Sequence, residues 1–101
     1  MTHNGLSLDP VKLKVTLDGR QLNLTSSEYK LLYALMSAPG KVFSRDELLD
    51  RFYQHGETVV DRVIDVHIGK LRQKIEHDPS APQKIITVRG FGYRFAEAEE
   101  S

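Results

Sequence analysis

The chain has 101 residues, of which 40% are hydrophobic and 28% charged, a composition typical of a globular protein with one modest core. It has no cysteine, which excludes disulfides and thiolate metal sites, and it has neither a secretion signal nor an apolar run near the roughly 18 residues of a membrane span. Its 14 basic and 14 acidic residues give no net charge, which by itself argues against a nucleic-acid ligand. We expect a single cytoplasmic domain over residues 1–101.

The first quarter of the chain has the alternating pattern of β-strands. Apolar residues alternate with polar ones around Leu6 and Leu8, and the alternation returns on either side of residues 18 and 19. Asp18-Gly19 is a dipeptide that tolerates the positive φ angles of a tight turn. We therefore predict a hairpin over residues 12–24, with its apolar side formed by Leu13, Val15, Leu17, Leu22 and Leu24.

Two helices follow, and each begins with a capping box. Thr25 and Glu28 form the first T-x-x-E pattern, in which each side chain satisfies a free backbone N–H at the helix start. Ser44 and Glu47 form the second, and Pro39-Gly40 between them ends the first helix. The expected inner faces are Tyr29, Leu32, Leu35 and Met36 for the first helix, and Leu49, Phe52 and Tyr53 for the second.

A third helix is predicted over about residues 58–76, followed by a hairpin over residues 85–95. One narrow sector of the helical wheel collects its core residues, namely Val60, Ile64, Ile68, Leu71 and Ile75. In the hairpin, Ile85–Val88 and Tyr93–Phe95 flank Arg89-Gly90-Phe91-Gly92. The order of a β-rich segment, three helices and a two-stranded wing predicts an α+β fold of winged helix-turn-helix type.

The opposite face of the third helix suggests contact with DNA. It combines small apolar residues with long donors, and its members are Val59, Arg62, Val66, Gly69, Lys70 and Gln73, with Val63 at the edge. Valine methyls can meet thymine methyls in the major groove, while Lys and Arg can donate to guanine. The alternative is a helix face buried against another subunit.

Charge and the hairpin tip support the DNA interpretation. Residues 62–94 contain seven Lys/Arg and three Asp/Glu, a local excess of +4 that the rest of the chain balances. Arg89 lies at the hairpin tip, where it could enter a minor groove, and Thr87 and Tyr93 offer hydroxyls to phosphates. The alternatives are a mixed solvated surface and an ordinary exposed turn arginine. For His67, on the helix flank, a buried hydrogen bond and a phosphate contact stay equally open.

The sequence resembles the C-terminal effector domain of OmpR/PhoB-type two-component response regulators over nearly its whole length. The matching segments are LTSSEYKLL (24–32), PGKVFSRDELL (39–49), DRVIDVHIGKLRQKI (61–75) and TVRGFGYRF (87–95). The resemblance implies an N-terminal antiparallel sheet, a three-helix bundle and a C-terminal β-hairpin wing. It also implies sequence-specific binding of double-stranded DNA for transcription regulation, with the third helix in the major groove and the wing at the minor groove.

The resemblance assigns roles to individual positions. Base or groove contacts fall on Val63, Val66, Lys70, Arg72 and Arg89, and phosphate contacts on Arg62, His67, Thr87 and Tyr93. Asp65 would orient a neighbouring arginine or accept from a cytosine amino group. A loop that touches RNA polymerase in the family corresponds to Tyr53, Gln54, His55, Gly56 and Glu57, with Tyr53 where relatives often carry tryptophan. Position 69 is often basic in relatives, so Gly69 implies one phosphate contact fewer.

The expected partners are DNA, with a head-to-tail pair of domains on direct repeats, and RNA polymerase. The receiver domain that precedes this domain in the family is absent from the chain, and we expect the isolated domain to be monomeric. Neither cofactor nor metal is expected, because the scattered His3, His55 and His77 lack zinc-ligand spacing. The competing functions are a winged-helix module that binds a protein through its valines, and an enzyme, for which the sequence offers no catalytic motif.

Overall fold

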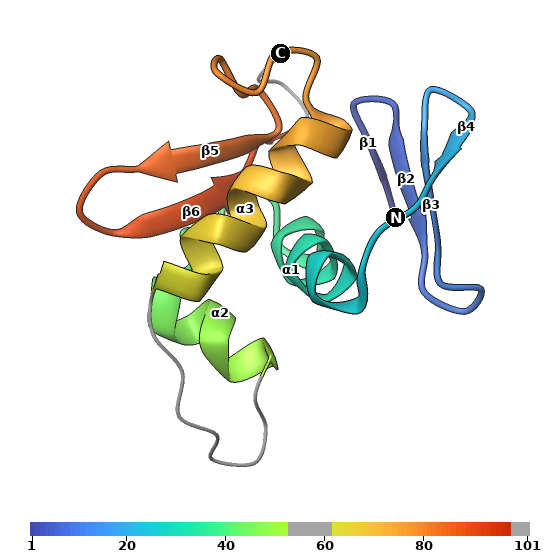
Figure 1. Cartoon of the computed structure of the whole chain (residues 1–101). Helices are drawn as coiled ribbons and strands as arrows, with labels where there is room; N and C mark the ends of the chain where they lie inside the picture. The colour runs from blue at the N-terminus through green and yellow to red at the C-terminus, as the bar shows by residue number, and fades with distance from the viewer. Residues whose placement is uncertain (53–61, 98–101) are drawn as a thin grey trace.

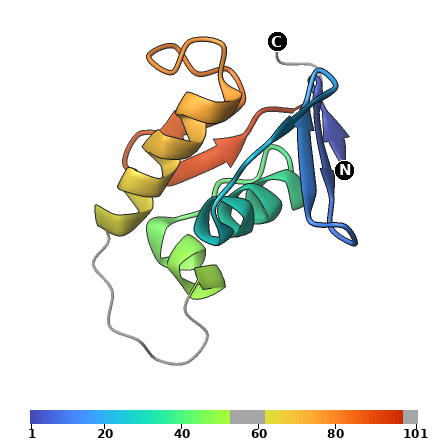
Figure 2. The same ribbon diagram turned by 45° about the vertical axis from the view of Figure 1, so that its right-hand side comes forward.

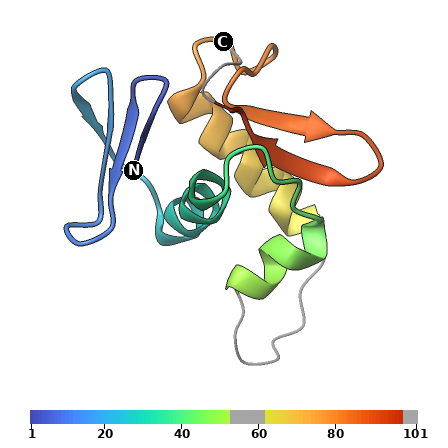
Figure 3. The same cartoon turned by 180° about the vertical axis from the view of Figure 1, so that it is seen from behind.

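The computed structural model describes residues 1–52 and 62–97, and the backbone alone at residues 52, 62 and 63. A four-stranded antiparallel sheet comes first, in the order β1 (Thr2–His3), β2 (Leu6–Asp9), β3 (Lys14–Leu17) and β4 (Arg20–Leu22). The sheet and the C-terminal hairpin lie on opposite sides of the helices (Figures 1 and 3). This is the winged helix-turn-helix arrangement expected from the order of elements.

The predicted β3–β4 hairpin is confirmed, with one change at its start. Asp18 and Gly19 both have positive φ, 51° and 85°, as a two-residue turn between right-twisted strands requires. Leu13 was expected on the apolar side of the hairpin, but it precedes β3, is 68% exposed and has a φ of 54°. Four residues before Leu13, Asp9 accepts the backbone N–H groups of Val11 and Lys12 and so starts the turn that takes Leu13 out of the sheet.

The first helix, α1 (Ser26–Ser37), occupies the centre of the domain, between the sheet and the other helices (Figure 2). Its capping box is complete: the Glu28 backbone N–H donates to Thr25 Oγ1 at 3.2 Å, and the Thr25 N–H donates to Glu28 Oε1 at 3.0 Å. A helix covered from two sides buries more than one stripe. Leu31 and Ala34 are therefore buried in addition to the expected Leu32, Leu35 and Met36.

The second and third helices are α2 (Arg45–Phe52) and α3 (Arg62–Ile75). The second capping box is also confirmed, since the Ser44 N–H donates to Glu47 Oε1 and the Glu47 N–H donates to Ser44 Oγ, both at 3.1 Å. The α3 core face is as predicted, with Ile64, Ile68, Leu71 and Ile75 at most 1% exposed. Residues 53–61, which include the expected start of this helix, lie outside the described residues.

The wing consists of β5 (Ile85–Val88) and β6 (Gly92–Phe95), paired from Ile85↔Phe95 to Val88↔Gly92. The end of α3 is joined to it through Glu76, which is 8% exposed. Its carboxylate accepts the backbone N–H groups of Lys84 and Ile85 at 2.9 and 2.8 Å, and that of Gln83 at 3.0 Å. Glu76 therefore anchors the end of the segment that leads from α3 into β5.

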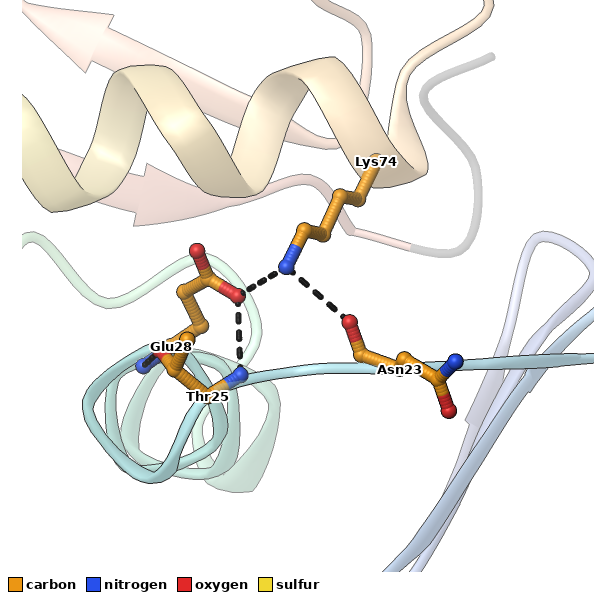
Figure 4. A network of polar contacts seen from close by, with 4 residues as sticks. All are labelled: Asn23, Thr25, Glu28 and Lys74. Carbon is orange, nitrogen blue, oxygen red and sulfur yellow. Dashed lines mark hydrogen bonds and ion pairs between the residues drawn. The ribbon is translucent and has the colours of Figure 1, made fainter.

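A partly buried ion pair joins α3 to the start of α1 (Figure 4). Lys74 Nζ donates to Glu28 Oε1 at 2.6 Å and to the Asn23 carbonyl at 2.9 Å. Burial raises the pKa of Glu28, but the hydrogen bonds from Lys74 and Thr25 outweigh it, and the net pKa is lowered. One carboxylate thus completes the capping box and neutralises the lysine that orients α3 on the bundle.

Candidate nucleic-acid interface

The outer face of α3 is open to solvent along the described part of the helix. Val66, Gly69, Lys70 and Gln73 are all exposed, and the Val66 side chain keeps 48% of its surface in water. They follow one another at three- and four-residue intervals, so they lie along one side of the helix. A Cβ added at Gly69 would meet no atom within 4 Å. The absence of a side chain there is thus not required by packing within the domain.

Arg72 joins this helix to the wing. Its Nη2 donates to the Ile85 carbonyl and to Thr87 Oγ1, both at 2.8 Å, and its Nε donates to the same carbonyl at 3.2 Å. Burial lowers the pKa of this guanidinium, although an arginine stays charged at neutral pH. Arg72 thus holds β5, because its position on α3 turns it toward the wing, and its base contact stays a prediction.

Tyr93 lies at the centre of a second link between α3, α2 and the wing. Its hydroxyl donates to Asp65 Oδ1 at 2.5 Å, and Arg45 Nε donates to the same oxygen at 2.8 Å. The guanidinium carbons of Arg45 and Arg72 lie 5.6 and 5.5 Å from the Tyr93 ring centroid, within the range of cation–π attraction. The wing is thus tied to both neighbouring helices through one aromatic side chain.

These contacts set the protonation of the Tyr93–Asp65 pair. Burial raises the pKa of Tyr93, and the carboxylate beside it raises it further. Burial also raises the pKa of Asp65, but the hydrogen bonds from Tyr93 and Arg45 outweigh it, and the net pKa is lowered. Tyr93 therefore stays a neutral donor to a charged carboxylate. With 5% of its surface exposed and its proton engaged, it is poorly placed for the expected phosphate contact.

The wing tip is a tight turn with two exposed side chains. The Phe91 backbone N–H donates to the Val88 carbonyl at 2.9 Å, and Gly90 has a φ of 81°, as the third residue of a type II turn requires. Arg89 is exposed at the second turn position, where it was predicted. Phe91, which received no role from the sequence, is 72% exposed.

Other candidate residues have different positions. Thr87 is exposed on β5 and accepts from Arg72, so its own proton is available to a ligand. His67 is half-buried on α3. Arg62 and Val63 belong to α3, but their side chains, like the whole expected polymerase loop, lie outside the described residues. That loop comprises Tyr53, Gln54, His55, Gly56 and Glu57.

The wing is also held by a backbone contact with Phe43 that the sequence did not reveal. Phe43 pairs with Tyr93 in an antiparallel bridge, with N···O distances of 2.8 and 2.9 Å. Gly92, with a φ of 148°, makes this approach possible, because a Cβ there would lie 1.9 Å from the Phe43 carbonyl oxygen. The G-F-G pattern of the wing was a visible signal of a close approach, but the sequence did not identify Phe43 as the partner.

The described surface outside the α3–wing face has hollows near the sheet and the first two helices. Two hollows of about 350 and 400 Å³ lie beside Tyr29, lined by residues of the sheet, α1 and α2 rather than by the α3–wing face. Within residues 1–52 and 62–97, no group of three or more His, Asp or Glu side chains could hold a metal ion. None of the helices described there has the length and apolar character needed to cross a bilayer.

Comparison with known proteins places most of this chain in one family. Residues 19–95 match the family described as transcriptional regulatory protein, C terminal. A probable transcriptional regulatory protein of Picosynechococcus is 46% identical over 90 residues, covering 89% of this chain and 36% of that protein. The chain therefore spans little more than a third of the length of this curated relative.

Two solved structures are similar in both fold and sequence. The response regulator DrrB of Thermotoga maritima, described as an OmpR/PhoB homolog, superposes with a TM-score of 0.89 at 34% identity, covering 96% of this chain and 44% of DrrB. The RstA DNA-binding domain of Klebsiella pneumoniae, solved in complex with the RstA box, has a TM-score of 0.85 at 35% identity, with 95% of each chain covered. The chain belongs to the family of C-terminal domains of OmpR/PhoB-type transcriptional regulatory proteins.

Proposed function

We propose that this domain binds double-stranded DNA sequence-specifically, as the output part of a two-component response regulator. The exposed face of α3 enters the major groove and the wing tip meets the adjacent minor groove. The observation that carries the proposal is the exposure of Val66, Gly69 and Lys70 on a helix that is linked to the wing by Arg72. A B-DNA major groove about 12 Å wide admits such a helix.

The chemistry of each group fits this placement. Lys70 can donate to guanine O6 and N7, and the Val66 methyls can meet a thymine methyl. Gly69 allows the helix backbone to approach the sugar-phosphate chain closely. Thr87 can donate its proton to a phosphate while it accepts from Arg72, and Arg89 carries its charge to the minor groove.

The charges of the interface support a salt-dependent association. Asp65 is the acidic residue within α3, and Arg45 at the start of α2 pairs with it at 2.8 Å. The one carboxylate within α3 (residues 62–75) is therefore paired, and no unpaired negative charge of this helix opposes the approach of an anionic ligand to Lys70. We propose further that Arg62 and His67 contact phosphates, that Val63 contacts bases, and that residues 53–57 contact RNA polymerase.

The proposal is tested by selecting bound sites from random duplex DNA and measuring their affinity by fluorescence anisotropy. Lys70→Ala is expected to weaken binding to the selected site by roughly 1–3 kcal/mol. Lys30→Ala is the matched control, because Lys30 is also an exposed helical lysine but lies on α1. Log Kd should rise with log salt, with a slope near 0.9 per phosphate contacted.

The opposite results would overturn the proposal. Selection without any enriched sequence, or equal affinities for the Lys70→Ala and Lys30→Ala variants, would remove α3 from the role of reading bases. If α3 binds a protein through its valines instead, association with that protein would be insensitive to salt. We also propose a solution monomer that forms head-to-tail pairs on direct repeats, and sedimentation with one-site and two-site duplexes measures this.

A further inference from the structure

The wing leaves one large aromatic ring in water. Phe91 is 72% exposed, whereas Phe95 and Tyr93 on the neighbouring strand are 0% and 5% exposed. The ring therefore contributes little to the core, and its exposure adds apolar surface to a tip that is otherwise suited to an anionic ligand. Single exposed apolar residues are common on protein surfaces. The position of this one is what makes it informative.

Phe91 shares its turn with the cation proposed to enter the minor groove. The hydrogen bond from Phe91 N–H to the Val88 carbonyl, 2.9 Å long, closes the turn, so Arg89 and Phe91 are its second and fourth residues. Both side chains are exposed. The tip is held against the bundle by the pairing of Tyr93 with Phe43. Any surface that Arg89 reaches thus lies close to Phe91 as well.

We propose that Phe91 is an apolar minor-groove contact and a determinant of the DNA sequence that the domain prefers beneath the wing. The proposal rests on the DNA-binding function proposed above. The walls of the minor groove are formed by deoxyribose C–H groups, which suit an aromatic ring, and Phe is one of the residues that proteins insert into this groove. Arg89 supplies the charge attraction and Phe91 the apolar contact.

A ring at this position has a consequence for specificity. The minor groove of B-DNA is about 6 Å wide and must widen to accept a phenyl ring. Flexible pyrimidine–purine steps such as TA deform easily, whereas A-tracts are stiff and narrow. We therefore expect the domain to prefer a TA step beneath the wing over an A-tract, although no hydrogen bond reads that position.

The test compares two duplexes that carry the same selected half-site and differ in the segment beneath the wing, one with a TA step and one with an A-tract. Wild-type protein should bind the TA duplex more tightly. Phe91→Ala should weaken binding to that duplex about tenfold, the order expected for an aromatic side chain that becomes buried on binding, and should lose the preference. The salt dependence should be unchanged, because no charge is removed.

Val11→Ala is the matched control, since Val11 is 90% exposed and lies between β2 and β3. The sheet that contains these strands lies across the helices from the wing (Figure 1). The Val11→Ala variant should bind both duplexes like the wild type. Equal binding by Phe91→Ala and wild type would overturn the inference. A loss of affinity seen only on duplexes with two half-sites would also overturn it, because it would indicate that the ring contacts a second copy of the domain. Lys70→Ala is measured alongside: if it also binds like the wild type, the proposed function itself has failed.

Discussion

Replacing Gly92 by alanine tests whether the wing is held by the β-bridge between Phe43 and Tyr93. The new Cβ would lie 1.9 Å from the Phe43 carbonyl oxygen and 2.9 Å from its carbonyl carbon, so the two backbones must separate. Their separation breaks the hydrogen bonds of 2.8 and 2.9 Å between Phe43 and Tyr93. The φ of 148° adds backbone strain for any residue with a Cβ.

The magnitude follows from these contacts. Each lost backbone hydrogen bond costs about 1 kcal/mol net. A non-glycine residue in a sparsely populated backbone region costs about 1–3 kcal/mol. We expect the free energy of unfolding to fall by about 3–5 kcal/mol, which lowers the Tm of a domain of this size by more than about 12 °C.

Gly69→Ala is the same chemical change with the opposite expected sign. Gly69 is exposed within α3, and its added Cβ would meet nothing within 4 Å. Alanine in a helix interior is favoured over glycine by roughly 0.5–1 kcal/mol, so the Tm should rise by about 2–8 °C. Thermal and urea unfolding followed by circular dichroism measure both variants. If Gly92→Ala melts within about 4 °C of the wild type, the bridge between Phe43 and Tyr93 does not hold the wing.

Three further predictions concern the polar links. Lys74→Met should lower the free energy of unfolding in urea by about 1–3 kcal/mol, because it leaves the Glu28 carboxylate, which is 2% exposed, without its cation. Lys74→Arg is the control, and an equal loss of stability in both variants would contradict the ion-pair explanation. Folding lowers the pKa of Glu28, so its contribution to the free energy of unfolding is complete above its unfolded pKa of about 4.3 and is lost as the pH falls through the folded pKa. The difference in the free energy of unfolding between wild type and Glu28→Gln should therefore shrink below about pH 4. Tyr93→Phe removes the donor to Asp65, so the pKa of Asp65 should rise in an NMR titration while DNA affinity is retained. A loss of DNA affinity would instead indicate that the Tyr93 hydroxyl contacts a phosphate.

Part of the fold is encoded in segments a few residues long. The two capping boxes, at Thr25 and Ser44, join atoms three residues apart, and both form as predicted. The Asp18-Gly19 turn and the wing turn at Gly90 depend only on local backbone conformation. Such features were predictable because the interacting atoms are neighbours in the chain and need no knowledge of packing.

The apolar periodicity of α3 separated its core face from its outer face, and both predictions were correct over the described residues. A helical wheel gives directions, however, and not partners. It placed Arg72 at the side of the helix, and only the position of β5 shows that this side contacts the wing. The same applies to α1, where burial of Leu31 and Ala34 follows from a sheet and two helices that pack against one helix.

The sequence by itself thus determined the order of the elements, their ends, and which side of the third helix is left for a ligand. Tertiary structure alone decided which polar residues are spent inside the domain: Lys74 meets Glu28 across 46 positions, Tyr93 meets Asp65 across 28, and Arg72 meets the wing across 13. Short-range preferences act over about four residues. Pairings over longer separations depend on where the hydrophobic core places each helix, and they determine which side chains remain available to DNA.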